Sequence, residues 1–297
     1  MTLLTNLHRV TALAATAMIL SACGGGSDTP PAPPPAPDQP PVAQLVCDDT
    51  LKAGFKPDTN TSVILVKAFK AGDPLIVSGA ASASTPKAAN DMCLVKMIVG
   101  PGNPGPAQAQ STSPGIGIEV WLPSKVKWNK RIHALGGGGW AGGTHTLPTT
   151  ISNGQGATIA GKEGAVSSST DTGHSGLGST FPPVVNGSWT LNPDGSINQA
   201  TWKDFASRAI YELAVKTKAL TTAYYGSPAK YSYWEGGSTG GRQGLRFAQE
   251  FPEISDGKHG WRSFVNTLRR DYMSRMDLRD VATVRSTRLH QLLTCVA

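Results

Sequence analysis

Apolar residues fall in short, strand-like runs through the first half of the chain. Several of these runs alternate apolar and polar positions, as half-buried strands do, and one ends at a proline. The expected strands are residues 61–69, 74–80, 94–99, 117–123, 132–135 and 164–169.

The clearest helical pattern follows over residues 202–220, where apolar residues line a broad face. An aromatic, strand-like run at residues 230–234 comes next, and residues 243–251 then resume helical spacing. This alternation of strands and helices predicts an α/β fold, with a mostly parallel sheet that carries helices on both faces.

The first 44 residues have a different composition. Arg9 precedes a short apolar run, Val10 to Leu20, which is too short to span a bilayer and predicts a signal peptide over residues 1–22. Leu20-Ser21-Ala22-Cys23 resembles a bacterial lipobox, which predicts a lipid-modified Cys23 and a membrane-anchored, exported protein. Secretion after an ordinary cleavage is the alternative. Residues 23–44 are rich in proline and predict an extended linker.

The net charge of the chain says little about which partners it binds. The formal net charge is +7, but residues 258–297 alone hold eight Lys or Arg and three Asp, which accounts for +5. The rest of the chain is nearly balanced, and no nucleic-acid-binding motif is present. We therefore expect no nucleic-acid partner.

Cysteines indicate a disulfide. Cys47 and Cys93 are the only cysteines in the first half of the folded region, and an exported domain meets oxidising conditions. A Cys47–Cys93 bridge would stabilise the fold by roughly 4 kcal/mol in the chain-entropy model. Two free thiols are the alternative, and Cys295 is expected to be free.

One short motif carries the chemistry. Gly236, Ser238 and Gly240 spell G-x-S-x-G between the aromatic strand and the following helix. This context is typical of the nucleophile elbow of α/β-hydrolases, where a serine sits on a sharp strand-to-helix turn. A glycine-rich surface turn is the alternative.

A second glycine-rich segment, residues 136–143, follows the strand at 132–135. In an α/β-hydrolase this loop supplies one backbone N–H of the oxyanion hole; a mobile surface loop is the alternative. Asp171 and His174 precede the serine, whereas these enzymes run Ser, then Asp or Glu, then His. We therefore interpret both as groups that fix a loop.

These motifs together resemble the tannase/feruloyl esterase family, over about residues 45–257. The resemblance is carried by residues 118–123, 128–129, 138–142, 169–174, 204–206, 233–244, 251–253 and 256–257.

The resemblance implies an α/β-hydrolase core that hydrolyses esters of aromatic acids. Ser238 would be the nucleophile, and the N–H groups of Thr239 and Gly138 would form the oxyanion hole, with Gly137 as the alternative donor. It implies a small-molecule aromatic ester as substrate and no cofactor, since the calcium site of the family's lid domain is not expected here.

The sequence departs from the family pattern in two places, and both departures change the activity that we expect. The family usually has a Cys directly before the nucleophile, bridged to a Cys beside the catalytic His, and here that position is Gly237. After Gly257 the family pattern stops, and residues 258–297 form an Arg-rich tail. We expect no further buried strand there, and the helical spacing of Phe264, Leu268, Tyr272 and Met276 favours helix or disorder.

The lid domain and the C-terminal part of the core are thus expected to be missing, as after a frameshift or truncation. Asp271, Asp277 and Asp280 precede His290, but neither this set nor His259 is expected to complete a triad. The sequence predicts a serine esterase of low or no activity. The alternative is a non-catalytic surface lipoprotein that binds aromatic esters or glycans.

Overall fold

The computed structural model describes residues 45–175, 187–251, 254, 261–266 and 273–277. The predicted signal peptide, Cys23 and the proline-rich linker lie outside the described residues. So do His259, Asp271, Asp280, His290 and Cys295. None of the described helices is long and apolar enough to cross a bilayer.

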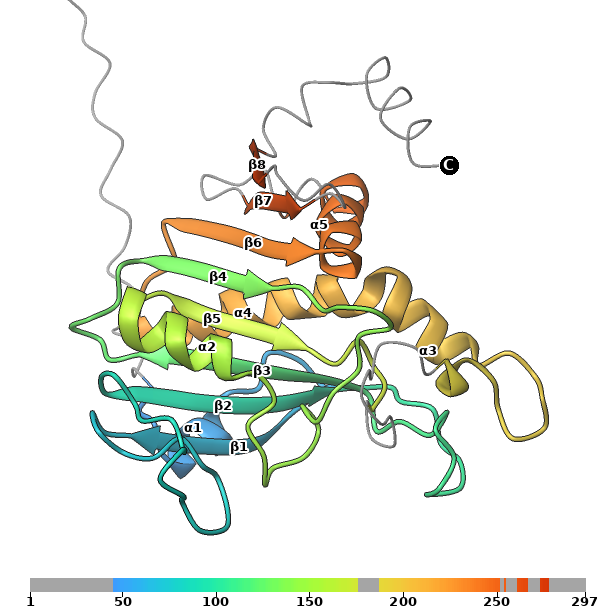
Figure 1. The fold of residues 1–297 in the computed structure, drawn as a ribbon, viewed down its shortest axis with the longest axis horizontal. Coiled ribbons are helices and arrows are strands. Elements are labelled where there is room, and N and C mark those ends of the chain that lie inside the picture. Colours follow the sequence, from blue (N-terminus) through green and yellow to red (C-terminus); the bar gives the residue numbers. More distant parts are fainter. Residues whose placement is uncertain (1–44, 176–186, 252–253, 255–260, 267–272, 278–297) are drawn as a thin grey trace, which may run out of the picture. The chain divides into compact units, whose positions relative to one another are not determined.

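A single eight-stranded sheet organises residues 61–277 in the order β1-β2-β3-β5-β4-β6-β7-β8 (Figure 1). The strands are β1 (Thr61–Phe69), β2 (Met92–Val99), β3 (Ile116–Pro123), β4 (Arg131–Leu135), β5 (Val166–Thr170), β6 (Tyr231–Gly237), β7 (Trp261–Asn266) and β8 (Met273–Asp277).

The sheet is mixed, and the expected mostly parallel arrangement is wrong at its edges. Strands β5, β4, β6 and β7 are mutually parallel, whereas β1, β2 and β3 pair antiparallel, as do β3 with β5 and β7 with β8. Parallel neighbours need a crossover connection, usually a helix, and no helix is described between β1 and β2 or between β2 and β3. The α/β class itself is confirmed.

Helices cover both faces of the sheet (Figure 1). On one face α4 (Ala209–Tyr225) packs its buried Leu213 into the same core as Val120 of β3. On the other face α2 (Gly154–Thr158) and the π-turn η1 (Ile159–Glu163) pack around Trp121. Since Val120 and Trp121 are neighbours on one strand, their side chains point to opposite faces. The two cores therefore sandwich the sheet.

The long helix expected at residues 202–220 is present and extends further. It runs from α3 (Gln199–Lys203) through the π-turn η4 (Asp204–Arg208) into α4. The remaining helical elements are α1 (Asp49–Gly54), the short η3 (Ser188–Thr190) and α5 (Thr239–Glu250).

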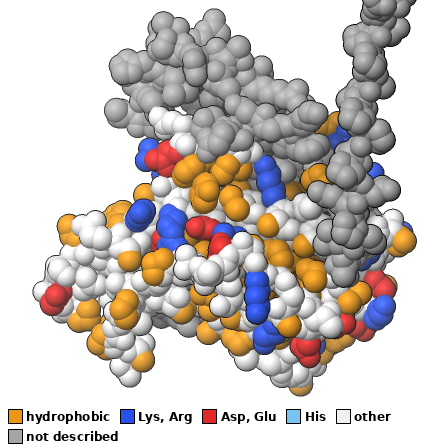
Figure 2. Space-filling view, turned by 180° about the vertical axis from the view of Figure 1, so that it is seen from behind, with side chains coloured by type: hydrophobic (Ala, Val, Ile, Leu, Met, Phe, Trp, Pro, Cys, Tyr) orange, Lys and Arg blue, Asp and Glu red, His pale blue; other side chains and the backbone are white. Residues whose placement is uncertain are grey.

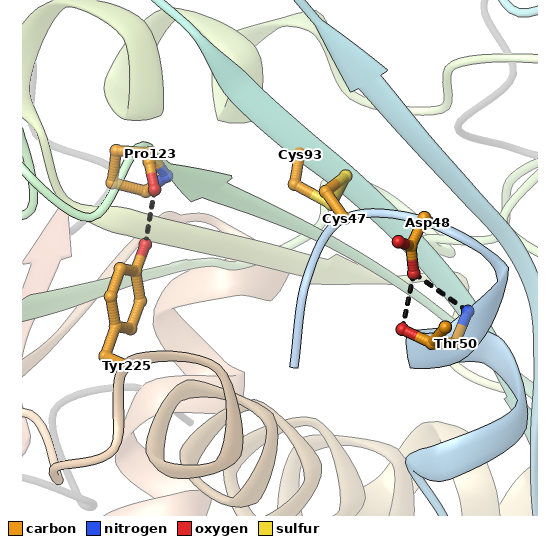
Figure 3. The surroundings of a disulfide bond; sticks show 6 residues. All are labelled: Cys47, Asp48, Thr50, Cys93, Pro123 and Tyr225. Carbon is orange, nitrogen blue, oxygen red and sulfur yellow. Dashed lines mark hydrogen bonds between the residues drawn. A yellow bond between two sulfur atoms is a disulfide. The ribbon is translucent and has the colours of Figure 1, made fainter. Parts of the chain in front are cut away.

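The disulfide between Cys47 and Cys93 is confirmed, with a Cα–Cα distance of 5.8 Å (Figure 3). It joins the segment before α1 to the start of β2. Asp48 caps α1 by accepting a hydrogen bond from the Thr50 N–H at 2.8 Å. Close to this disulfide, where Pro123 pairs with Met92, the Tyr225 hydroxyl donates to the Pro123 carbonyl at 2.7 Å (Figure 3).

Two further sequence predictions are wrong. Residues 74–80 form no strand, only an isolated bridge between Pro74 and Lys87. The tail was expected to contain no sheet strand, yet β7 pairs with β6 along its whole length and β8 pairs with β7. Phe264 and Met276 therefore lie in strands rather than in one helix, and the edge of β6 is paired. Strand pairing with β6 overrides the local helical spacing.

Charged side chains of both signs are interspersed on the face shown in Figure 2. The described surface there carries no large area of a single charge.

Candidate active site at Ser238

Ser238 is the single residue between the end of β6 at Gly237 and the start of α5 at Thr239. Its backbone has φ 52° and ψ −119°, in a region that residues with a side chain rarely adopt. Such a conformation costs about 1–3 kcal/mol and persists only where the surrounding structure enforces it. Ser238 is also exposed at the turn. The predicted strand-turn-helix context is therefore confirmed.

The glycines of the motif allow three backbone segments to meet at this turn. A Cβ on Gly236 would lie 2.5 Å from the carbonyl carbon of Gly240, and one on Gly240 would lie 2.9 Å from the Gly137 carbonyl oxygen. Real Cβ atoms do not approach backbone this closely, so the elbow needs glycine at both positions.

The glycine-rich loop begins beside this turn. Gly136 donates its N–H to the Glu235 carbonyl at 2.8 Å, which extends the pairing of β4 with β6 by one residue. Gly137 donates its N–H to the Gln243 Oε1 at 2.9 Å. The N–H of Gly137 is therefore occupied, and Gly138 is the next residue along the loop.

Two N–H groups remain as candidates for the oxyanion hole. Gly138 is exposed, and its N–H has no partner in the described part of the chain. Thr239 is the first residue of α5, where backbone N–H groups have no intrahelical acceptor. The Thr239 hydroxyl donates to the Gly139 carbonyl, which ties the loop to the elbow.

The far side of the loop is held by His174 and a group of aromatic rings. His174 Nε2 donates to the Trp140 carbonyl at 2.9 Å, and its ring stacks on Trp189 with centroids 4.1 Å apart. Burial lowers the pKa of His174 to about 4, so its imidazole is neutral near pH 7. The Trp140 ring also packs against Trp202 and Phe205.

Asp171 holds the loop that carries His174. Its Oδ1 accepts hydrogen bonds from the N–H groups of Gly117 at 2.8 Å and Gly173 at 2.9 Å. Burial raises the pKa of Asp171 to about 8. These contacts support the interpretation of Asp171 and His174 as loop-fixing groups.

A buried ion pair that sequence reasoning missed supports the following segment. Lys96 Nζ lies 3.5 Å from Glu119 Oε2 and donates to the Thr144, Leu147 and Thr150 carbonyls. Glu119 accepts from the N–H groups of Ser152 at 2.7 Å and Asn153 at 3.0 Å. A signal was present, because each charge interrupts an otherwise apolar strand.

The described histidines all have partners other than Ser238. His133 Nε2 lies 2.7 Å from Glu235 Oε2, His145 Nε2 lies 3.0 Å from Ser169 Oγ, and His174 bonds Trp140. In the part of the chain that the structure describes, the glycine-rich loop thus contacts the Ser238 turn, and no histidine is hydrogen-bonded to Ser238. Nor do the described His, Cys, Asp and Glu side chains include a group of three or more that could hold a metal ion.

Comparison with known proteins identifies the family. The family model described as "Tannase and feruloyl esterase" matches residues 103–261, more than half of the chain. The chain belongs to the tannase and feruloyl esterase family. The match includes β3, the glycine-rich loop, the elbow and α5, and it ends at the first residue of β7.

Individual members of the family support this assignment. A probable feruloyl esterase from Arthroderma benhamiae is 36% identical over 176 residues, which is 59% of this chain and 29% of that protein. Feruloyl esterase B from Aspergillus niger is 30% identical over 171 residues, or 58% of this chain and 27% of that protein. The chain therefore spans under a third of the length of these relatives.

Solved structures agree on the fold. The crystal structure of feruloyl esterase B from Aspergillus oryzae superposes with a TM-score of 0.50 at 28% identity, covering 70% of this chain and 34% of that one. An esterase from Aspergillus oryzae gives the same TM-score at 23% identity, and this likeness bears on the fold alone.

Proposed function

We propose that this chain carries the nucleophile and the oxyanion hole of a serine carboxylic ester hydrolase that acts on esters of aromatic acids. The observation that carries the proposal is the backbone of Ser238, with φ 52° at the one-residue junction between β6 and α5. The names of the family members support esters of aromatic acids as the substrate class.

The proposed chemistry is acyl transfer. Ser238 Oγ attacks the ester carbonyl carbon and loses its proton to a base. The N–H groups of Thr239 and Gly138 stabilise the resulting oxyanion, with each donor worth about 3–4 kcal/mol in well-studied hydrolases. The alcohol then leaves, and water releases the acid from the acyl-enzyme.

We infer that this chain alone hydrolyses esters weakly. The three described histidines have other partners, and Asp271, Asp277, Asp280, His259 and His290 offer no family motif. Without a base, only binding and the oxyanion hole remain, which together give about 10³–10⁴-fold over water in the well-studied case.

The test supplies the base from solution. Hydrolysis of an activated aromatic ester is measured with the full chain and with Ser238→Ala, over a range of imidazole concentrations. We expect the wild-type rate to be near background without imidazole. With imidazole it should rise above the imidazole-only rate, whereas that of Ser238→Ala should not. Equal rates for the two proteins with imidazole would contradict the role of Ser238.

The absence of a described base also favours a second candidate, a non-catalytic surface lipoprotein that binds aromatic esters or glycans. It predicts saturable ligand binding without turnover at any imidazole concentration, in the wild type and in Ser238→Ala alike. A different result would be that the wild type hydrolyses the ester saturably without added imidazole, with the activity abolished by Ser238→Ala. That result would contradict both this non-catalytic candidate and the inference that the chain alone hydrolyses esters weakly.

We also propose that the chain is exported and anchored to a membrane through a lipid on Cys23. The proposal rests on the apolar run before Leu20-Ser21-Ala22-Cys23. Fractionation of cells that express the full chain tests it. The wild type should sediment with membranes and Cys23→Ser should not. Equal sedimentation of the two would contradict the anchor.

A further inference from the structure

Gln243 links the helix of the nucleophile to the glycine-rich loop. It lies on α5, five residues after Ser238, and its side chain is 1% exposed. Its Oε1 accepts the Gly137 N–H at 2.9 Å. Because only an oxygen can accept this bond, the orientation of the carboxamide is fixed by its partner.

This bond lies where the loop leaves the sheet. The preceding N–H, that of Gly136, still pairs with β6 through the Glu235 carbonyl. At Gly137 the acceptor becomes a helix side chain instead of a strand, so the backbone turns away from the ladder. Gly138, the next residue of the loop, is exposed, and its N–H has no partner in the described part of the chain.

Burial of the Gln243 side chain has a free-energy cost that some interaction must offset. Its Nε2 is buried without a hydrogen-bond partner in the described part of the chain. A buried, unpaired amide donor costs about 1–3 kcal/mol, so an apolar side chain of this size would suit the site better if packing alone mattered. The bond to Gly137 is the compensating interaction that the structure shows.

The loop is otherwise anchored in only a few places near the nucleophile. The Thr239 hydroxyl bonds the Gly139 carbonyl, and the Ala141 N–H closes a tight turn on the Gly138 carbonyl at 2.7 Å. Gly237 stands where the family usually has a bridging Cys, so no disulfide stiffens this elbow. Gln243 and Thr239, both on α5, thus bond the loop at Gly137 and Gly139.

We propose that Gln243 is a positioning residue of the oxyanion hole, which engages Gly137 and so presents the Gly138 N–H to the substrate. The inference rests on the proposed function for its catalytic consequence, but the restraint on the loop is measurable separately. The two parts therefore need two readouts on the same variants of the full chain.

The variants are Gln243→Met, which conserves shape and removes the acceptor, and Gln249→Met, the same change at an exposed position of α5. Gln243→Asn is a second test variant, since it keeps an amide but withdraws it by one methylene. Gln243→Glu retains an oxygen acceptor and serves as the conservative rescue.

The first readout is hydrogen exchange of the Gly137 amide, followed by NMR. We expect exchange to be at least about tenfold faster in Gln243→Met and Gln243→Asn, because the bond that protects this amide is lost. Gln249→Met and Gln243→Glu should exchange like the wild type. If Gln243→Met does not fold, the exchange rate of the Gly137 amide in Gln243→Asn decides whether Gln243 protects this amide.

The second readout is the imidazole-supported hydrolysis of an aromatic ester. We expect kcat to fall by about 10–100-fold in Gln243→Met with KM nearly unchanged, since an oxyanion donor acts mainly in the transition state. Gln249→Met should match the wild type, and Gln243→Glu should recover part of the loss. A merely structural defect would lower the active fraction without this recovery.

Unchanged exchange of Gly137 in Gln243→Met and Gln243→Asn would overturn the proposal, and so would faster exchange with an unchanged kcat. If the wild type shows no Ser238-dependent hydrolysis, the proposed function fails instead. The exchange readout then decides alone whether Gln243 restrains the loop.

Discussion

Gly136 and Gly240 lie so close together that a Cβ on Gly136 would be 2.6 Å from the Gly240 Cα. The loop after β4 and the first turn of α5 are thus in direct backbone contact beside Ser238. Any side chain at this contact must push the glycine-rich loop away from the turn at Ser238.

Gly240→Ala is expected to destabilise the fold by about 1–3 kcal/mol, as overpacking of a tight site does. It should also reduce imidazole-supported hydrolysis. Chemical denaturation measures the first effect. Gly154→Ala is the matched control, because a Cβ there would have no neighbour within 4 Å. Equal stability losses in the two variants would contradict the close contact.

Lys96→Met is expected to cost about 3–5 kcal/mol of unfolding free energy, because it leaves the Glu119 charge buried without its partner. Urea or guanidinium titration is the measurement. Lys70→Met is the control: the Lys70–Asp91 pair is 2.9 Å long but exposed, and surface pairs contribute about 0–1 kcal/mol. A loss below 1 kcal/mol in Lys96→Met would show that the buried pair is dispensable.

The raised pKa of Asp171 predicts that the stability of the fold depends on pH. Its pKa rises from 3.8 to about 8 on folding, chiefly through burial, so the folded state binds a proton that the unfolded state releases between these values. This group therefore contributes a loss of stability as pH rises from about 4 to 8, of at most about 1.4 kcal/mol per pH unit.

Asp171→Asn should flatten that slope, because an amide keeps the oxygen that accepts from Gly117 and Gly173 and does not titrate. Asp194→Asn, at an exposed carboxylate whose pKa is lowered by Ser196, should leave the slope between pH 4 and 8 unchanged. Unfolding free energies measured across this range check both. Identical slopes in the wild type and Asp171→Asn would contradict the buried, protonated carboxyl.

The sequence predicted those parts of the fold and of the candidate site that depend on residues close together in the chain. Gly236, Ser238 and Gly240 are separated by single residues, so their spacing sufficed to predict the elbow, and the loop at residues 136–143 was recognisable from its glycine content. Lys96 and Glu119 each stand out as a charge in an apolar strand, but their pairing joins two strands and is not a local pattern. The Gln243–Gly137 bond likewise joins residues far apart in the sequence. Strand β7 was missed because its pairing with β6 is a tertiary effect.

Direct acylation tests whether Ser238 is the nucleophile, as proposed. The full chain and Ser238→Ala are incubated with an activated aromatic ester in the presence of imidazole, and the acyl group is located by intact and peptide mass spectrometry. We predict one acyl group per chain, on the peptide that contains Ser238, and no such adduct in Ser238→Ala. Acylation spread over lysines, or equal in the two proteins, would contradict the proposed role of Ser238.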